Sequence, residues 1–153
     1  MNKLLPPLTI FLVCSLLQAC SGDRPTDLGI QETGAPLKQC PESPNCVVSF
    51  YQEKDPDHYL EPIKIESPAK KAYENILSLL KKLPRVKIFK KEENYIRTEF
   101  TSAVFGFVDD VEFYFAEEGK IHFRSASRIG HSDLGVNKDR IEKIRFKYHQ
   151  RDF

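Results

Sequence analysis

The chain lacks an uninterrupted apolar run long enough to cross a membrane. Its most apolar stretch, from Leu8 to Leu17, follows Pro6-Pro7 and is interrupted at three positions. A membrane-spanning helix needs about 20 apolar residues. The stretch therefore has the length of a signal peptide rather than that of a membrane span.

The sequence also lacks an excess of either charge. It holds 23 basic and 22 acidic residues, and loss of Lys3 with a signal peptide would leave a neutral chain. No basic block is present either, so there is no electrostatic reason to expect nucleic acid as a partner.

Familiar catalytic motifs are missing as well. The sequence contains no G-x-S-x-G, P-loop or G-x-G-x-x-G pattern, and its four histidines lack a metal-ligand spacing such as H-E-x-x-H. Ser67-Pro68-Ala69-Lys70 matches the S-x-x-K pattern of penicillin-binding enzymes without its companion motifs, and Ser67 is better explained as a helix cap. The sequence therefore predicts neither a cofactor nor a metal.

The segment Leu17-Gln18-Ala19-Cys20 has the layout of a bacterial lipoprotein signal, with a small residue directly before a cysteine. We expect residues 1–19 to be a signal peptide and Cys20 to carry lipid, so that the membrane is a partner through this anchor. An ordinary secretory signal cut near Ala19 is the alternative. Ser21, where an aspartate is absent, favours the outer membrane in a cell that has two membranes. The predicted location is the cell envelope.

Cys40 and Cys46 bracket five residues, Pro41-Glu42-Ser43-Pro44-Asn45. In an exported chain a pair this close indicates a disulfide that closes a tight loop. Zinc would favour a shorter spacing and further ligands, and redox catalysis would favour C-x-x-C.

Composition divides the rest of the chain into two parts. Residues 20–39 are rich in glycine and proline and poor in large apolar side chains, which is typical of a flexible tether. Residues 40–153 are enough for a single domain with one core and too few for two domains.

Periodicity predicts the elements of this domain. We expect strands at 61–66, 86–91, 95–101, 107–116 and 120–129, a helix that follows Ser67-Pro68 and stops before Pro84, and a closing helix from about Lys138 with Asn137 as its cap. The fold class is therefore α+β, with an antiparallel sheet of four to five strands and two helices on one face (β-α-β-β-β-β-α).

Alternation in the last two strands separates an apolar face from a charged one. Asp109 shares the face of the aromatic residues, where it needs a rim position, a donor such as Ser127 or a basic partner. The opposite face collects Asp110, Glu112, Tyr114, Arg124 and Arg128. A three-residue loop at 118–120 predicts a register that sets Phe115 against Phe123 and Asp110 against Arg128.

This charged face has two interpretations. The favoured one is a lattice of cross-strand ion pairs on a solvated surface, each pair contributing about 0.2–1 kcal/mol. The alternative is a polar site in which Arg124 and Arg128 bind an anionic or carbonyl group and Asp110 or Glu112 assists.

The segment 130–140 feeds the last helix. Gly130 and Gly135 suggest special backbone angles, and Asp133 and Asn137 can bond nearby backbone groups. A capped connection that serves its own backbone is favoured over an anion site at the helix N-terminus.

Three groups of residues resemble a known family, the domain of unknown function 1499 family. They are Cys40-Pro41 with Pro44-Asn45-Cys46, then 106–113, and then 124–130 continuing through 132–135 and Asn137 to Arg140-Ile141. The resemblance runs from about residue 40 to residue 146. It implies a small exported or membrane-associated protein, and it implies no activity, cofactor or substrate.

The polar residues of these motifs are the candidates for ligand binding. They are Asp109, Asp110, Glu112, Arg124, Ser127, Arg128, Ser132, Asp133, Asn137 and Arg140. We expect a non-catalytic, lipid-anchored module that binds a small molecule or an envelope protein in a cleft near Arg124, Arg128 and the 130–140 segment. A small hydrolase or transferase that uses Asp110 or Glu112, and a purely structural lipoprotein, are the alternatives.

Overall fold

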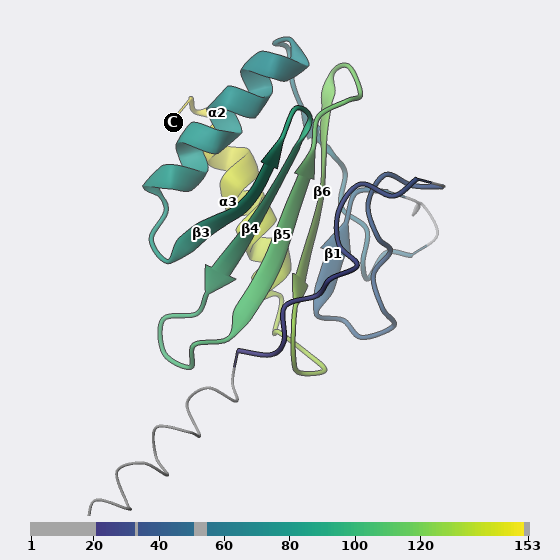
Figure 1. Cartoon of the computed structure of the whole chain (residues 1–153), viewed down its shortest axis with the longest axis vertical. Coiled ribbons are helices and arrows are strands. Elements are labelled where there is room, and N and C mark those ends of the chain that lie inside the picture. Colours follow the sequence, from purple (N-terminus) through teal and green to yellow (C-terminus); the bar gives the residue numbers. More distant parts are fainter. Residues whose placement is uncertain (1–20, 33, 51–54, 152–153) are drawn as a thin grey trace, which may run out of the picture.

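The computed structural model describes residues 21–32, 34–50 and 55–151, so the predicted signal peptide and Cys20 lie outside the described residues. The fold is α+β, as predicted: a six-stranded antiparallel sheet carries two helices on one face (Figure 1). The elements are β1 (Cys46–Val48), β2 (Ile63–Lys64), α2 (Ala69–Lys82), β3 (Val86–Glu92), β4 (Tyr95–Thr101), β5 (Val108–Tyr114), β6 (Lys120–Ser127) and α3 (Val136–His149).

The sheet is a meander from β3 to β6, and two short strands share the free edge of β6. β1 pairs with the second half of β6, where Cys46 faces Ala126, and β2 pairs with the first half, where Ile63 faces Ile121. The prediction of four to five strands missed β1, because three residues inside a proline-rich loop carry too little periodicity to indicate a strand.

Helix α2 follows Pro68 and ends one residue before Leu83-Pro84, close to the predicted bounds. Ser67 does not cap it, contrary to the prediction, because no side-chain capping bond is made and the Ser67 hydroxyl lies 3.4 Å from the Tyr148 hydroxyl. Pro68 is the N-cap residue, and its backbone oxygen accepts the amides of Lys71 and Ala72.

Helix α3 begins at Val136, two residues earlier than predicted, with Gly135 as the N-cap at a φ of 83°. The prediction that Asn137 caps this helix is wrong, since Asn137 lies inside the first turn. Asp133 supplies the side-chain oxygen instead and accepts the Asn137 amide at 2.6 Å.

The apolar core lies between the sheet and the two helices. Val111, Phe113 and Phe123 point into it from β5 and β6, and Ile76 and Ile141 meet them from α2 and α3. Complete burial of such side chains contributes about 1.5–3 kcal/mol each. This layer fixes which face of the hairpin is apolar and leaves the charged face on the other side of the sheet.

The β5–β6 register differs from the predicted one by two residues. Phe113 faces Phe123, Glu112 faces Arg124, and Asp110 faces Ala126. The connection between β5 and β6 is residues 115–119, longer than the predicted three residues. A shift of two residues leaves every side chain on its predicted face, because side chains alternate with a period of two.

The segment 21–38, expected to be a tether, lies against the sheet instead. It crosses the face opposite the helices (Figure 1, dark purple to blue), where the Gly29 amide donates to Glu112 at 3.0 Å and Arg97 donates to the Pro25 carbonyl at 3.0 Å. Leu37 is buried as well. Polar groups on the sheet therefore hold a segment whose composition alone is typical of a linker. The disulfide between Cys40 and Cys46 is present, as predicted, and it joins this segment to β1.

Candidate functional site

The charged face of the sheet is buried, whereas the favoured interpretation of the sequence was a solvated surface. We call its charged residues on β4, β5 and β6 the ion-pair cluster. They are Arg97, Glu99, Asp110, Glu112, Arg124 and Arg128, and all six side chains are buried. The sequence analysis did not single out Arg97 and Glu99, although alternation along β4 would have placed both on this face.

Two arginines converge on Asp110. Arg97 donates to its Oδ1 at 2.9 Å, and Arg128 donates to its Oδ2 at 2.7 Å through Nε. Arg128 also donates to Glu99 at 2.6 Å through Nη2. Asp110 and Arg128 therefore share one side of the sheet, as predicted, although they meet diagonally and not as directly opposed residues.

Glu112 is fully buried and has two different oxygens. Its Oε1 accepts the Tyr95 hydroxyl at 2.7 Å and the Gly29 amide at 3.0 Å. Its Oε2 lies 3.7 Å from Arg124 Nη1 and, like Arg124 Nε, has no hydrogen-bond partner in the described parts of the chain. Burial raises the pKa of Glu112 and lowers the pKa of Arg124. These two charges are desolvated and depend on each other for compensation.

The geometry favours a structural role for this cluster. Asp110 is 1% exposed and both of its oxygens already accept bonds from arginines, so it is not placed to act as a base on a substrate from solvent. The guanidinium of Arg128 is occupied by Asp110 and Glu99 in the same way.

We expect the folding stability of the protein to fall steeply in acid. The bond from Arg24 and the neighbouring Arg128 lower the pKa of Glu99 from 4.5 to about 2. A carboxyl with a depressed folded-state pKa contributes stability above its unfolded value, and this contribution is lost as the pH falls through the folded value. Glu99 should therefore stabilise the fold above about pH 4.5 and lose its effect as the pH approaches 2.

Urea unfolding between pH 7 and pH 2 measures this loss. Glu99→Gln should reduce the loss of unfolding free energy between pH 4.5 and pH 2. Glu118→Gln, at an exposed position in the β5–β6 loop, should leave that loss unchanged. Glu112 acts in the opposite direction: its pKa is raised, so its protonation favours the folded state as the pH falls. An equal loss of unfolding free energy in acid for the wild type and Glu99→Gln would contradict the stabilising role of the Glu99 carboxylate.

A second polar network joins α3 to the sheet around Asn137, which is fully buried. Its Nδ2 lies within hydrogen-bond distance of three oxygens: Asn45 O at 3.0 Å, Ser127 Oγ at 3.0 Å and Asp133 Oδ2 at 2.9 Å. Its Oδ1 accepts bonds from Ser125 and Arg140. We call these residues, with Asp109, the Asn137 network. They hold the start of α3 against β1 and β6.

Asp109 finds the basic partner that its place on the apolar face requires. Arg140 donates to Asp109 Oδ2, and Ser127 is the cross-strand neighbour of Asp109. Arg140 also donates to Ser125 at 3.1 Å and lies over the Phe100 ring. Arg140 thus acts as the link between the core face of the sheet and the first turn of α3.

The segment before α3 serves its own backbone, which was the favoured interpretation. The Ser132 hydroxyl accepts the Leu134 amide at 3.2 Å, and Asp133 Oδ1 accepts the Gly135 amide at 3.0 Å. Ser132 and Asp133 are therefore turn-forming residues in this structure.

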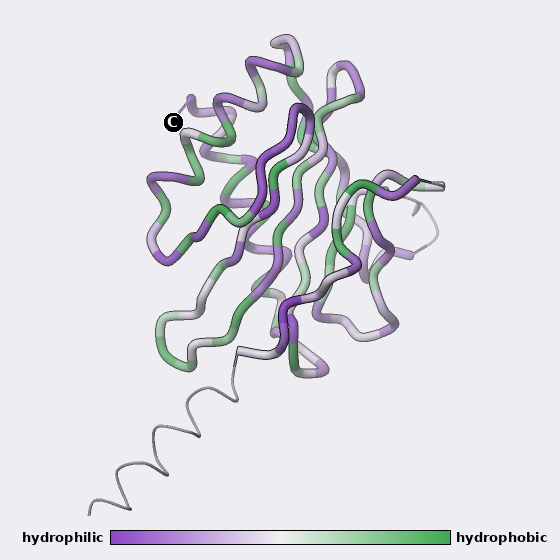
Figure 2. Tube along the Cα trace, viewed as in Figure 1, coloured by the Kyte–Doolittle hydropathy of each residue, from purple (hydrophilic) through white to green (hydrophobic). Residues whose placement is uncertain are grey.

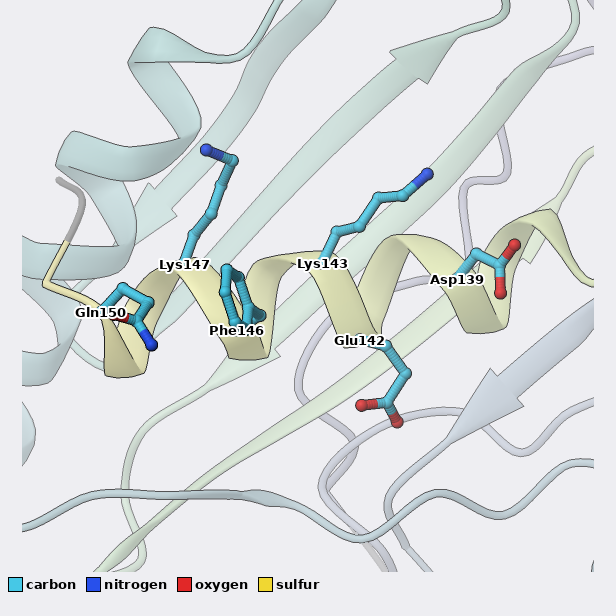
Figure 3. Close-up of a pocket in the computed structure, with 6 residues that line it drawn as sticks. All are labelled: Asp139, Glu142, Lys143, Phe146, Lys147 and Gln150. Atoms are coloured by element: carbon cyan, nitrogen blue, oxygen red, sulfur yellow. The ribbon is translucent and has the colours of Figure 1, made fainter.

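A groove of about 440 Å³ lies between the end of α2 and α3, beside the ends of β4 and β5. It is bordered by Leu83, Pro84, Arg85, Phe100, Thr101, Ser102, Asp109, Val136, Asp139, Arg140, Lys143, Ile144 and Lys147. Of the predicted site residues, Asp109 and Arg140 border this groove. Figure 3 draws a second pocket on α3, which shares Lys143 and Lys147 with this groove; it shows these two side chains projecting from the same side of the helix, whereas Glu142 projects from another side.

The groove combines an apolar lining with an excess of basic side chains, because Arg85, Arg140, Lys143 and Lys147 border it together with Asp109 and Asp139. The partly exposed Leu83 and Phe100 and the exposed Val136 supply the apolar surface. Arg85 and Lys143 are exposed, and neither forms an ion pair with another residue in the described ranges. This arrangement can receive a molecule that has an apolar part and an anionic group.

Ser49, His122 and Glu117 are connected in the order of a catalytic triad, which the sequence analysis missed. Ser49 Oγ lies 3.1 Å from His122 Nδ1, and His122 Nε2 lies 2.7 Å from Glu117. Ser49 is buried, however, and its hydroxyl accepts the Phe123 amide at 2.8 Å. This hydroxyl fastens the end of β1 to β6 and is not presented to a substrate.

Two features are absent from the described residues, a metal-binding group and a membrane-spanning helix. No three or more histidine, cysteine or acidic side chains are grouped there in a way that could hold a metal ion. None of the helices within residues 21–32, 34–50 and 55–151 has the length and apolarity needed to cross a membrane.

The fold and the two networks define a small disulfide-containing α+β domain whose motif residues mainly support its own structure. The family model described as "Protein of unknown function (DUF1499)" matches residues 36–147. The chain belongs to this family, as the motifs in its sequence predicted. A comparison with curated proteins gave no match.

Proposed function

We propose that this protein is a lipid-anchored domain of the bacterial cell envelope that binds a small amphipathic anion, without catalysis, in the groove between α2 and α3. The observation that carries the proposal is the exposed pair Arg85 and Lys143 above an apolar lining. Hydrogen bonds to charged groups contribute about 1.5–3 kcal/mol each, so an anionic head group would gain from both side chains while its apolar part covers Leu83 and Phe100.

The envelope location rests on two features of the chain. The lipobox ending at Cys20 supports export and lipidation. The Cys40–Cys46 disulfide fits an oxidising compartment. Both features are independent of the groove.

The backbone of Arg85 supports a binding role for this residue. Arg85 has a φ of 57°, in the left-handed region where a residue other than glycine is disfavoured by about 1–2 kcal/mol. Glycine would adopt this angle more easily. An arginine that is held at such an angle on the border of a groove is consistent with a function for its side chain.

Binding of two probes, dodecanoate and dodecyl phosphate, tests the groove. Calorimetry below the critical micelle concentration should detect one saturable site for these anions and none for the uncharged dodecyl maltoside. The double variant Arg85→Ala/Lys143→Ala should weaken binding by about tenfold or more, because tenfold corresponds to about 1.4 kcal/mol and two charged contacts are lost.

The matched control is Lys91→Ala/Lys138→Ala, which removes the same charge from two exposed positions outside the groove. Equal binding by both double variants would refute the site. No saturable binding of either anion would favour the structural alternative, in which the ion-pair cluster and the Asn137 network are the whole purpose of the family motifs.

A further inference from the structure

Exposed apolar side chains gather at one end of the sheet. Six of the nine large hydrophobic residues that are exposed in the described ranges come from two neighbouring loops. They are Val104, Phe105 and Phe107 between β4 and β5, and Ile129, Leu134 and Val136 between β6 and the first turn of α3. The first loop is the green stretch at the lower left of Figure 2. We call these six side chains the apolar end.

The two loops protrude strongly and carry little charge. Val104 is 82% exposed, Phe105 68% and Leu134 94%. Residues 102–107 contain no charged side chain. In the second loop, the Asp133 carboxylate is already bonded to the amides of Gly135 and Asn137. Apolar tips of this size in contact with water are typical of an interaction surface.

The described chain begins at this same end. Gly22 packs so closely on the second loop that a Cβ built on it would lie 2.7 Å from Ile129 Cγ2. In the sequence, Cys20 precedes Gly22 by two residues. In Figure 1 the described part of the chain starts between the β4–β5 loop and the loop that precedes α3. Lipid on Cys20 would therefore leave the domain beside the apolar end.

We infer that the apolar end docks on the surface of the lipid bilayer, with Phe105 and Leu134 inserted among the acyl chains near the head groups. The inference rests on the proposed lipid anchor, because the anchor is what brings this end to the membrane. Val104, Phe105 and Phe107 supply one insertion loop and Leu134 supplies the other, while the N-terminal segment packed on the sheet prevents the domain from swinging away on a tether.

The docking surface also orients the groove. Ser102 and Val136 border the groove and lie in, or next to, the two loops of the apolar end. A bilayer in contact with this end would meet the groove at its border. An amphipathic anion could then pass between the lipid and Arg85 without crossing open water.

Single tryptophan probes test the inference, because the chain has no tryptophan of its own. Phe105→Trp and Leu134→Trp place a fluorophore in each loop, and Phe146→Trp places one on the exposed side of α3, 65% exposed and far along the helix. The lipidated full chain is reconstituted in phosphatidylethanolamine/phosphatidylglycerol vesicles with and without spin-labelled lipid. We expect a blue shift and quenching for the two loop probes, and water-like, unquenched emission for Phe146→Trp.

Flotation of the vesicles separates the possible failures. Protein that floats while the loop probes keep water-like emission would overturn the docking surface and leave the anchor intact. Protein that does not float, like a Cys20→Ser chain, would overturn the anchor and the docking with it. A blue shift without vesicles that grows with protein concentration would identify a second copy as the occupant and would overturn the inference too.

Discussion

Replacement of Asp110 by asparagine is expected to lower the free energy of unfolding by about 3–5 kcal/mol, the usual cost of removing one partner from a buried ion pair. Asp110 is 1% exposed and accepts hydrogen bonds from Arg97 and Arg128. Asparagine keeps the shape of the side chain and removes its charge. Arg128 would keep its bond to Glu99, whereas Arg97 would keep its bond to the neutral Pro25 carbonyl and lose its bonded carboxylate.

Urea unfolding at pH 7 measures this effect, with Glu118→Gln as the control at an exposed position, where a change within about 0.5 kcal/mol is expected. The same measurement in high salt gives a second test. Because buried pairs are screened much less than exposed ones, the loss should persist in 1 M sodium chloride. A loss below about 1 kcal/mol that disappears in salt is the behaviour of a surface pair, and it would show that segment 21–38 does not cover the cluster in solution.

Asn137→Ala is expected to destabilise the fold by about 3 kcal/mol or more. A buried polar group that loses a hydrogen-bond partner costs about 1–3 kcal/mol. This change removes one bond each from Ser125 and Arg140 and one of the two donors to Asn45 O, which keeps the Ser127 amide. Lys138→Ala, at the next and exposed position of the same helix turn, is the matched control. Denaturant unfolding of both variants gives the comparison.

The isosteric change Asn137→Asp distinguishes hydrogen bonding from packing. It fills the same space but turns the donor that faces Asn45 O and Asp133 Oδ2 into an acceptor. At pH 7 it should destabilise the protein at least as much as alanine does. A near-native stability of Asn137→Asp at this pH would mean that shape, and not the amide donor, is what the network needs.

The order and type of the long elements could be predicted because each carries its own periodicity. Ala72, Ile76 and Leu80 recur at helical spacing and are buried in α2, and the alternation of β5 correctly placed Phe113 on the core face and Asp110 on the other. β1 has no such pattern in its three residues, and the Ser67 cap was inferred from residue type alone. Local sequence could not show that Asp133 offers a better-placed oxygen to α3.

The sequence predicted which face of the sheet carries the charged residues, but not what lies against that face. Asp110 and Arg128 meet on one side of the sheet, as expected, even though the predicted register was wrong by two residues. Arg97, Glu99 and the covering segment were missed. Their contacts join residues far apart in the chain, such as Gly29 with Glu112, and no short-range pattern records such a pair.

The sequence by itself determined the α+β class, the disulfide and the division of each strand into an apolar and a charged face, because these depend on the spacing of neighbouring residues. Only the tertiary structure decided that the charged face is buried, that Asn137 links a helix to the sheet, that a groove with basic side chains lies between α2 and α3, and that an apolar end lies beside the start of the described chain. The physical reason is that a strand's pattern says which way its side chains point, whereas what lies against them is set by segments that arrive from elsewhere in the chain.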